Sequence, residues 1–231
     1  SAVSLANTGG ATLDLNSNNN TIASLAGGGT TGGNVTLGTG TLTTGGDNSS
    51  TSYGGVISGA GVLLKTGSGT LTLTGTNTYS SGTQVTGGAV SVVADANLGD
   101  SAGTLTLNNG QLTTTGAFSS SRPVTLTNTG TINTGSALTL SGALTGTGGL
   151  TKAGSSTLTL SGTSNAYSGT TTVSVGTLQA GAANAFSSSS AVSLANTGGA
   201  TLDLNSINNT IASLAGGGVD GGNVTLGMGT L

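Results

Sequence analysis

Apolar and polar residues alternate along much of the chain, most often as leucine or valine with threonine. Six short stretches carry the pattern most clearly: residues 12–15, 70–74, 104–107, 124–127, 137–140 and 157–160. A period of two with β-branched partners predicts β-strands. Gly, Ser, Thr and Asn interrupt the chain about every ten residues, and no stretch repeats its apolar residues at helical spacing. We therefore expect short strands and almost no helix.

A long internal repeat sets the domain organisation. Residues 1–42 recur as residues 190–231, and the two copies differ at four positions: Asn18/Ile207, Thr30/Val219, Thr31/Asp220 and Thr39/Met228. Such near identity indicates duplication of a large cassette. We predict one cassette at residues 1–189 and the start of the next at residues 190–231, joined as a single continuous solenoid.

A shorter repeat lies inside the cassette. Residues 61–75 match residues 148–162, and the likeness continues through Tyr79 and Tyr167. Each cassette therefore carries two related halves, around residues 61–90 and 148–178.

These repeats discriminate among the all-β architectures. A sandwich or barrel closes after a fixed number of strands, whereas a duplicated cassette must add end to end, each coil burying its Leu and Val on the one before. The predicted fold class is all-β, a parallel β-helix or β-solenoid built from tandem repeats. With about 20 residues in a coil and about 4.8 Å between coils, the chain would make about 11 coils. We expect Leu and Val inside and Thr outside.

Composition excludes most catalytic chemistry. The 231 residues include 45 Gly but no Cys, His or Trp, and the six acidic residues are all Asp. Catalytic triads, zinc sites and thiol redox centres therefore lack their usual side chains, and we expect no enzyme activity, cofactor or metal. The chain has 3 Lys and Arg residues, too few to neutralise a row of phosphates or to hold anionic lipid. We expect no nucleic-acid partner and no membrane contact by this segment.

A five-part motif fills the second half of the cassette. It reads Gly-Leu-Thr-Lys-Ala-Gly at 149–154, Thr-Leu-Thr-Leu-Ser-Gly at 157–162, Asn-Ala-Tyr-Ser-Gly at 165–169, Thr-Val at 172–173 and Gly-Thr-Leu at 176–178. The motif resembles the autotransporter-associated β-strand repeats in the passenger regions of bacterial autotransporter adhesins. The earlier copy departs from it at Leu64, at Ser81 and at residues 88–90. The resemblance implies a right-handed parallel β-helix, exported to the cell surface through a C-terminal barrel, that serves as a stalk or an adhesive surface.

Two sets of carboxylates are candidate sites. Asp95 and Asp100 flank a loop and would be the minimum pair for an inverting glycosidase, with Arg122 as the one cation to assist. Asp14 and its copy Asp203, each with the Asn two residues later, would be calcium ligands, but the spacing of the known calcium loops is absent. We interpret all four Asp as solvated loop or outer-face residues, and we assign no catalytic or metal site.

Lysine and tyrosine recur at fixed motif positions. Lys65 corresponds to Lys152, and Tyr79 corresponds to Tyr167. A repeated cation could contact a receptor, and repeated aromatic rings could stack on sugars. Two repeated Tyr and no Trp make sugar stacking weak. We expect the Lys side chains to cap loop carbonyls or space the stack, and the Tyr rings to pack over turns.

Two further patterns carry no assigned function. Strands that open with Thr-x-Thr start at residues 41, 70, 104, 125 and 157, which raises the alternative of an ice-binding face, but their spacing is too irregular for one flat array. Asn19, Asn34 and Asn48 begin glycosylation sequons. We give these Asn no role, because a chain rich in Asn, Ser and Thr contains sequons by chance.

The leading functional interpretation is a structural and adhesive stalk segment of a large repetitive bacterial surface protein, extracellular and either surface-bound or secreted. Many weak copies along one rod would give multivalent adhesion to a surface or between cells. The expected partners are host or neighbouring-cell surfaces or glycans, together with self-association. The alternative is a self-assembling extracellular filament or biofilm-matrix protein, with a polysaccharide-active β-helix enzyme and an ice-binding array as weaker alternatives.

Overall fold

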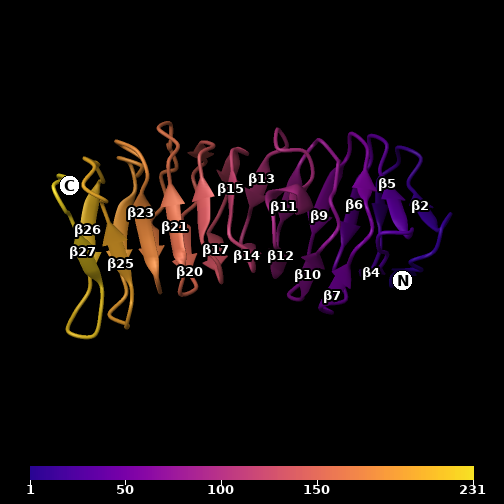
Figure 1. Cartoon of the computed structure of the whole chain (residues 1–231), viewed down its shortest axis with the longest axis horizontal. Coiled ribbons are helices and arrows are strands. Elements are labelled where there is room, and N and C mark those ends of the chain that lie inside the picture. The colour runs from indigo at the N-terminus through magenta and orange to yellow at the C-terminus, as the bar shows by residue number, and fades with distance from the viewer. The chain divides into compact units, whose positions relative to one another are not determined.

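The computed structural model describes all 231 residues, divided into two units, Ser1–Leu112 and Thr113–Leu231. Within each unit, short parallel strands from successive turns of the chain lie side by side (Figure 1). Along the whole chain there are about 11 such coils. The one helix is a 3-10 turn, η1 (Asp95–Leu98), and no helix is long and apolar enough to cross a membrane. The predicted all-β parallel solenoid with almost no helix is confirmed.

Three parallel sheets form the first unit. The first sheet holds β1 (Val3–Leu5), β4 (Leu25–Gly27), β7 (Thr51–Tyr53), β10 (Thr70–Leu73) and β12 (Ala89–Val92). The second holds β3 (Asn20–Thr21), β6 (Thr41–Thr44), β9 (Val62–Lys65), β11 (Thr83–Val85) and β13 (Leu105–Leu107). The third holds β2 (Thr12–Asp14), β5 (Asn34–Thr36) and β8 (Ile57–Ser58). A further strand, β14 (Gln111–Thr114), spans the boundary between the units.

The second unit repeats this plan. One sheet holds β17 (Gly130–Thr134), β20 (Leu150–Ala153), β22 (Thr171–Val173), β24 (Ala191–Leu194) and β26 (Ser213–Gly216). Another holds β15 (Phe118–Ser120), β18 (Leu138–Leu140), β21 (Thr157–Leu160), β23 (Thr177–Ala180), β25 (Thr201–Asp203) and β27 (Asn223–Thr225). A short pair joins β16 (Val124–Leu126) to β19 (Leu144–Thr145).

The alternating pattern places one side of each strand in a thin core. In the second unit, equivalent leucines pair in register and are at most 1% exposed: Leu138, Leu158, Leu178 and Leu202. Each of these side chains therefore packs on its equivalent in the neighbouring coil. Burying one leucine stabilises a fold by about 1.5–3 kcal/mol, so these columns supply much of the stability of a chain with few large apolar residues.

The expectation that threonine lies outside is only partly right. Five threonines point into the core and are at most 1% exposed: Thr44, Thr83, Thr114, Thr134 and Thr171. All but Thr44 form hydrogen bonds through the hydroxyl; Thr134, for example, donates to the carbonyl of Ser156 at 2.8 Å. An inward threonine keeps the β-branched shape that suits a strand and needs only one polar partner, which the nearby corner of the coil supplies.

Glycine makes the sharp corners of the coil. Gly27 has φ +81° and Gly28 has φ +63°, a left-handed conformation that residues with a side chain rarely adopt. A Cβ atom at Gly27 would also lie 2.2 Å from the carbonyl oxygen of Leu5 in the previous coil. Glycine is therefore required here both for the turn and for the close approach of the coils.

The two copies of the 42-residue repeat have the same local structure. Strands β1, β2, β4 and β5 of the first copy correspond to β24, β25, β26 and β27 of the second. The same glycine loop closes with an antiparallel bridge in each copy, from Gly29 to Gly32 and from Gly218 to Gly221.

Burial differs between the copies. Leu25 and Leu37 are 0% exposed, whereas their equivalents Leu214 and Leu226 are 45% and 44% exposed. Strands β7 and β8 follow the first copy and stack on its strands β4 and β5, whereas no described residue follows the second copy after Leu231. Because the local sequences match, the difference in exposure measures what the covering coil buries.

Candidate functional site

Asn77, the first residue of the Asn-x-Tyr motif, lies inside the first unit and is 3% exposed. Its Oδ1 accepts a hydrogen bond from the amide of Ile57 at 2.8 Å, in the coil before. Its Nδ2 donates to the carbonyl of Asn97 at 2.6 Å, in the coil after. One side chain thus joins three coils.

Asn165, the equivalent residue of the second unit, makes the same pair of bonds. Its Oδ1 accepts from the amide of Leu144 at 2.7 Å, and its Nδ2 donates to the carbonyl of Ala185. A net hydrogen bond contributes about 0.5–1.5 kcal/mol, but an unpaired buried group costs about 1–3 kcal/mol, so the asparagine fixes the spacing of the coils.

The motif tyrosines are also internal. Tyr79 is 0% exposed and Tyr167 is 1% exposed, so neither ring is available to a ligand. The hydroxyl of Tyr79 is 2.6 Å from that of Thr83, and the hydroxyl of Tyr167 is 2.7 Å from that of Thr171. Both rings therefore pack inside the solenoid, and the surface role in sugar stacking is excluded for both.

The motif lysines cap carbonyls from inside the solenoid. Lys152 is 0% exposed, and its Nζ donates to the carbonyls of Ala153, Gly154 and Val175 at 3.0, 2.8 and 2.9 Å. Lys65 does the same with the carbonyls of residues 66, 67 and 87. The predicted capping role is confirmed. Burial lowers the pKa of Lys152 from 10.5 to about 8, and burial also lowers the pKa of Lys65, against a smaller opposing effect of the Asp47 carboxylate.

This pKa shift predicts that the protein becomes more stable as the pH rises from about 8 towards 10. The amine of Lys152 loses its proton at lower pH in the folded chain than in the unfolded chain, so unfolding takes up a proton in this range. Above pH 10 the trend reverses, because burial raises the pKa of Tyr53 and Tyr167 and the unfolded tyrosines ionise first. Urea midpoints measured from pH 7 to 11 should therefore pass through a maximum near pH 10.

The Lys152→Met variant is the control for this profile. It keeps an unbranched apolar stem but leaves three carbonyls without their donor, so we expect a lower midpoint at pH 7 and only the part of the rise that Lys65 contributes. A wild-type midpoint that is flat or falling between pH 8 and 10 would contradict the assignment.

The calcium candidates form turns. The Oδ1 of Asp14 accepts from the amide of Asn16 at 2.8 Å, and Asp203 and Asn205 repeat this contact at the same distance. Asp203 also accepts from the Nε2 of Gln179 at 2.9 Å on the outer face of β23 and β25. The interpretation of these carboxylates as outer-face residues is confirmed. The structure gathers no group of three or more His, Cys, Asp or Glu.

The glycosidase candidates lie together on the first unit. Asp95 opens η1, and Asp100 follows it with its Oδ1 accepting from the amide of Ala102 at 2.9 Å. Both carboxyls therefore belong to one short turn rather than to facing walls of a cleft. Arg122 belongs to the second unit, where its amide donates to the hydroxyl of Ser120 at 3.3 Å.

The Thr-x-Thr strands do not share a face. Strands β6, β10 and β21, which begin at Thr41, Thr70 and Thr157, belong to three different sheets. The conclusion drawn from their irregular spacing is therefore confirmed: these starts do not form one flat array.

The sequon asparagines have a role that sequence analysis missed. The Oδ1 atoms of Asn19, Asn34 and Asn48 accept from backbone amides 20 to 22 residues later, at 2.8, 3.0 and 2.9 Å. Each therefore ties one corner of the solenoid to the next coil. The sequence held one signal for this role, because each of these Asn lies in a turn, one coil length before another polar turn.

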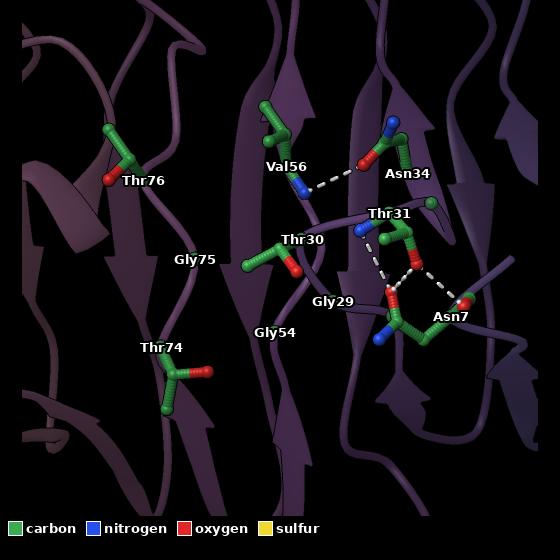
Figure 2. Close-up of a pocket in the computed structure, with 12 residues that line it drawn as sticks. Asn7, Gly29, Thr30, Thr31, Asn34, Gly54, Val56, Thr74, Gly75 and Thr76 are labelled. Atoms are coloured by element: carbon green, nitrogen blue, oxygen red, sulfur yellow. Dashed lines mark hydrogen bonds between the residues drawn. The ribbon is translucent and has the colours of Figure 1, made fainter. Parts of the chain in front are cut away.

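A groove lined by polar residues lies in the first unit. It encloses about 670 Å³ at the corner that follows β1, β4, β7 and β10, and Figure 2 shows its lining residues. The lining consists of Asn7, Gly28, Gly29, Thr30, Thr31, Gly32, Asn34, Gly54, Val56, Thr74, Gly75 and Thr76. None of these residues is charged, none is aromatic, and the one large apolar residue is Val56. A smaller hollow of about 330 Å³ lies in the second unit beside Asn165 and Phe186.

The loop that forms one wall of the groove is fixed in place. Thr31 donates from its amide and its hydroxyl to the Oδ1 of Asn7 at 3.0 and 2.8 Å. The amide of Gly29 donates to the carbonyl of Gly32 at 2.9 Å. The hydroxyl of the buried Tyr53 donates to the carbonyl of Gly33 at 2.6 Å, so the loop is held from both ends.

The motif positions described above coincide with a known repeat family. Residues 63–92 and 150–180 match the passenger-associated-transport repeat. Each matched segment includes its Lys, Asn and Tyr: the Lys and Asn bond to neighbouring coils, and the Tyr is buried. The resemblance to autotransporter passenger repeats is confirmed.

A comparison with curated proteins also finds an autotransporter. The chain is 41% identical over 152 residues to the adhesin BmaC autotransporter of Brucella suis biovar 1 (strain 1330). The match covers 65% of this chain and 4% of that protein. The chain therefore spans a small part of the relative that it matches. No solved structure matches the chain.

Proposed function

We propose that this chain is an adhesive stalk segment in the passenger region of a large autotransporter, exposed outside the bacterial cell. The observation that carries the proposal is that both segments matching the passenger-associated-transport repeat use their Lys and Asn to join neighbouring coils, while their Tyr is buried, so the motif builds a scaffold. The 41% identity to a protein named as an autotransporter adhesin supports an adhesive rather than an enzymatic role.

Adhesion in this proposal is multivalent. Outward strand residues and turns repeat from coil to coil, so a weak contact made by one cassette recurs in every cassette of a tandem array. Linked weak contacts raise effective concentration, and the avidity of a tandem array can exceed that of one unit by about 10²–10⁴. The expected partners are surfaces of host or neighbouring cells and their glycans.

Concatemers of residues 1–189 test this function. Retention of fluorescent protein carrying one, two or four cassettes is measured on cultured cells and on bacterial cells. We expect retention to rise faster than in proportion to the number of cassettes. The control is one cassette at fourfold molar concentration, which presents the same number of contacts without the link. No retention at any number of cassettes would refute adhesion.

A self-assembling filament is the second candidate, and two exposed apolar residues favour it. Val219 and Met228 are 98% and 90% exposed, at positions where the first copy has the exposed Thr30 and Thr39. Such a face could pair between chains. Sedimentation of the purified chain at rising concentration separates the candidates, because a filament former associates and a stalk segment stays monomeric.

A further inference from the structure

We propose that the groove beside the Gly27–Gly33 loop is a binding site for a segment of a neutral, linear polysaccharide. The inference rests on the proposed adhesive function and names the class of ligand that this surface would recognise. It is drawn from the groove in the first unit, which lies over four successive coils at one corner of the solenoid.

The chemistry of the lining selects the ligand. The hydroxyls of Thr30 and Thr76 and the Nδ2 of Asn34 are not used in hydrogen bonds within the protein, and both threonines are exposed. In Asn7, likewise, only the Oδ1 and the backbone carbonyl oxygen accept hydrogen bonds from the loop. These groups donate and accept without charge, which suits the hydroxyls of a neutral sugar and gives an acidic sugar no cation to pair with.

A polypeptide ligand fits the groove less well. The groove lies at the corner after the strands, so it offers no free strand edge to which an extended peptide could add. Its one large apolar residue, Val56, provides no pocket for an anchoring side chain. A sugar chain needs neither feature.

Glycine gives the ligand access to the backbone. A Cβ atom at Gly54 would lie 3.2 Å from the hydroxyl of Thr74, 3.4 Å from the carbonyl oxygen of Gly28 and 3.6 Å from the Cα of Gly29. The absence of a side chain at this position keeps the floor of the groove open between its two walls. In Figure 2 the Thr74 hydroxyl points to the side on which Gly54 lies.

The spacing of the coils suits a polymer lying along the solenoid. Equivalent positions in neighbouring coils are about 4.8 Å apart, close to the length of one sugar unit in an extended chain. A linear polysaccharide in the groove would therefore meet a new corner with each sugar. The loop is already fixed by Asn7 and Tyr53, so binding need not order it, and the associated entropy cost is small.

The second copy of the loop provides a natural variant. All four differences between the copies fall at positions exposed in the first copy, and two of them are adjacent at the loop tip, where Thr30 and Thr31 become Val219 and Asp220. The amide at the tip keeps its bond, from Asp220 to the Oδ1 of Asn196 at 3.1 Å. The side chains at the loop tip therefore differ between the copies, while the backbone conformation of the loop is kept. Such variation on a fixed backbone is typical of residues that contact a ligand.

The test uses the intact 231-residue chain and a panel of immobilised sugars. The neutral probes are oligomers of cellulose, β-1,3-glucan, mannan and chitin; the acidic probes are hyaluronan and polygalacturonate; gelatin is the polypeptide probe. We expect binding to at least one neutral probe. The double variant Thr30→Val, Thr76→Val keeps the shape of both side chains, and we expect it to weaken that binding about tenfold, since two hydroxyl contacts are lost.

A matched pair of substitutions controls for surface polarity. Thr151 and Thr172 pair in register on the outer side of β20 and β22, away from the groove, and the variant Thr151→Val, Thr172→Val should bind as wild type does. Binding to the acidic probes or gelatin alone, no binding to any neutral probe, or equal affinity in both double variants would overturn the assignment. If concatemers adhere to cells while no neutral sugar binds, this inference fails and the proposed function stands; if concatemers do not adhere at all, the proposed function fails independently.

Discussion

The Asn77→Asp variant is expected to unfold more easily than wild type by about 3–5 kcal/mol at pH 7. The Nδ2 of Asn77 donates to the carbonyl of Asn97 at 2.6 Å, in a site that is 3% exposed. A carboxylate at this position replaces a donor with an acceptor, so it faces the Asn97 oxygen without a proton between them and is itself poorly solvated. The bond from the amide of Ile57 survives, which confines the loss to one side of the residue. Urea unfolding followed by far-UV circular dichroism measures the difference.

The pH dependence of this variant identifies the cause. Burial should raise the pKa of the new carboxyl above the unfolded value of about 3.9, so the penalty is absent below that pH and grows as the pH rises through it. The control is Asn19→Asp. Asn19 is exposed, and only its Oδ1 is used, as acceptor for the amide of Thr41, which a carboxylate also provides. We expect this control to change the free energy of unfolding by less than about 0.5 kcal/mol. Equal losses in the two variants would show that Asn77 does not join the coils.

Leucine positions in the core were predictable from the sequence, because alternation with threonine fixes which side of a strand is apolar. Leu138 and Leu158 were assigned inward on that basis, and they are 1% and 0% exposed. The duplicated cassette then required end-to-end stacking of coils. The solenoid could therefore be predicted from the sequence without knowing any contact between residues. The capping role of Lys152 was also predicted, because a rare cation at a repeated position among Gly and Thr has few other partners.

The roles of the asparagines were not predictable in the same way. The bond from Ile57 to Asn77 depends on the exact length of one coil, and hydrogen bonds between coils join residues that are 19 to 25 positions apart. An error of one residue in a turn exchanges the inward and outward sides, so spacing estimated as about 20 residues cannot pair side chains. Thr83 shows the same limit: it looks like an outer-face threonine and lies in the core, where the hydroxyl of Tyr79 satisfies it. The groove was missed because a loop of Gly and Thr has no pattern of its own.

Adding a coil to the second copy is expected to raise the thermal midpoint of the chain by roughly 4–8 °C. The designed extension appends a copy of residues 43–66 after Leu231, which reproduces the sequence that stacks on the first copy. Leu214 and Leu226 should then become as buried as Leu25 and Leu37, which are 0% exposed. Recovering the burial of two half-exposed leucines contributes about 2 kcal/mol, and register bonds of the type that joins β6 to β3 add to it. Nearest-neighbour stacking of this kind is the main source of stability in a solenoid.

Hydrogen exchange gives this prediction an internal standard, since the two copies lie in one molecule. Peptides from 24–42 and 213–231 have nearly the same intrinsic exchange rates. They differ in mass because of the three substitutions Thr30/Val219, Thr31/Asp220 and Thr39/Met228. In the original chain the second peptide should exchange faster; in the extended chain the two rates should converge. The control extension carries Ser at the positions that copy Ile57 and Leu63, both 0% exposed in the first unit, and it should leave the rates apart because it cannot bury the leucines. Two results would contradict the prediction: exchange rates that converge in the control extension, or rates that stay apart in the designed extension. Either would mean that stacking of the covering coil does not protect the first copy, so the coil would not be the unit that stabilises this solenoid.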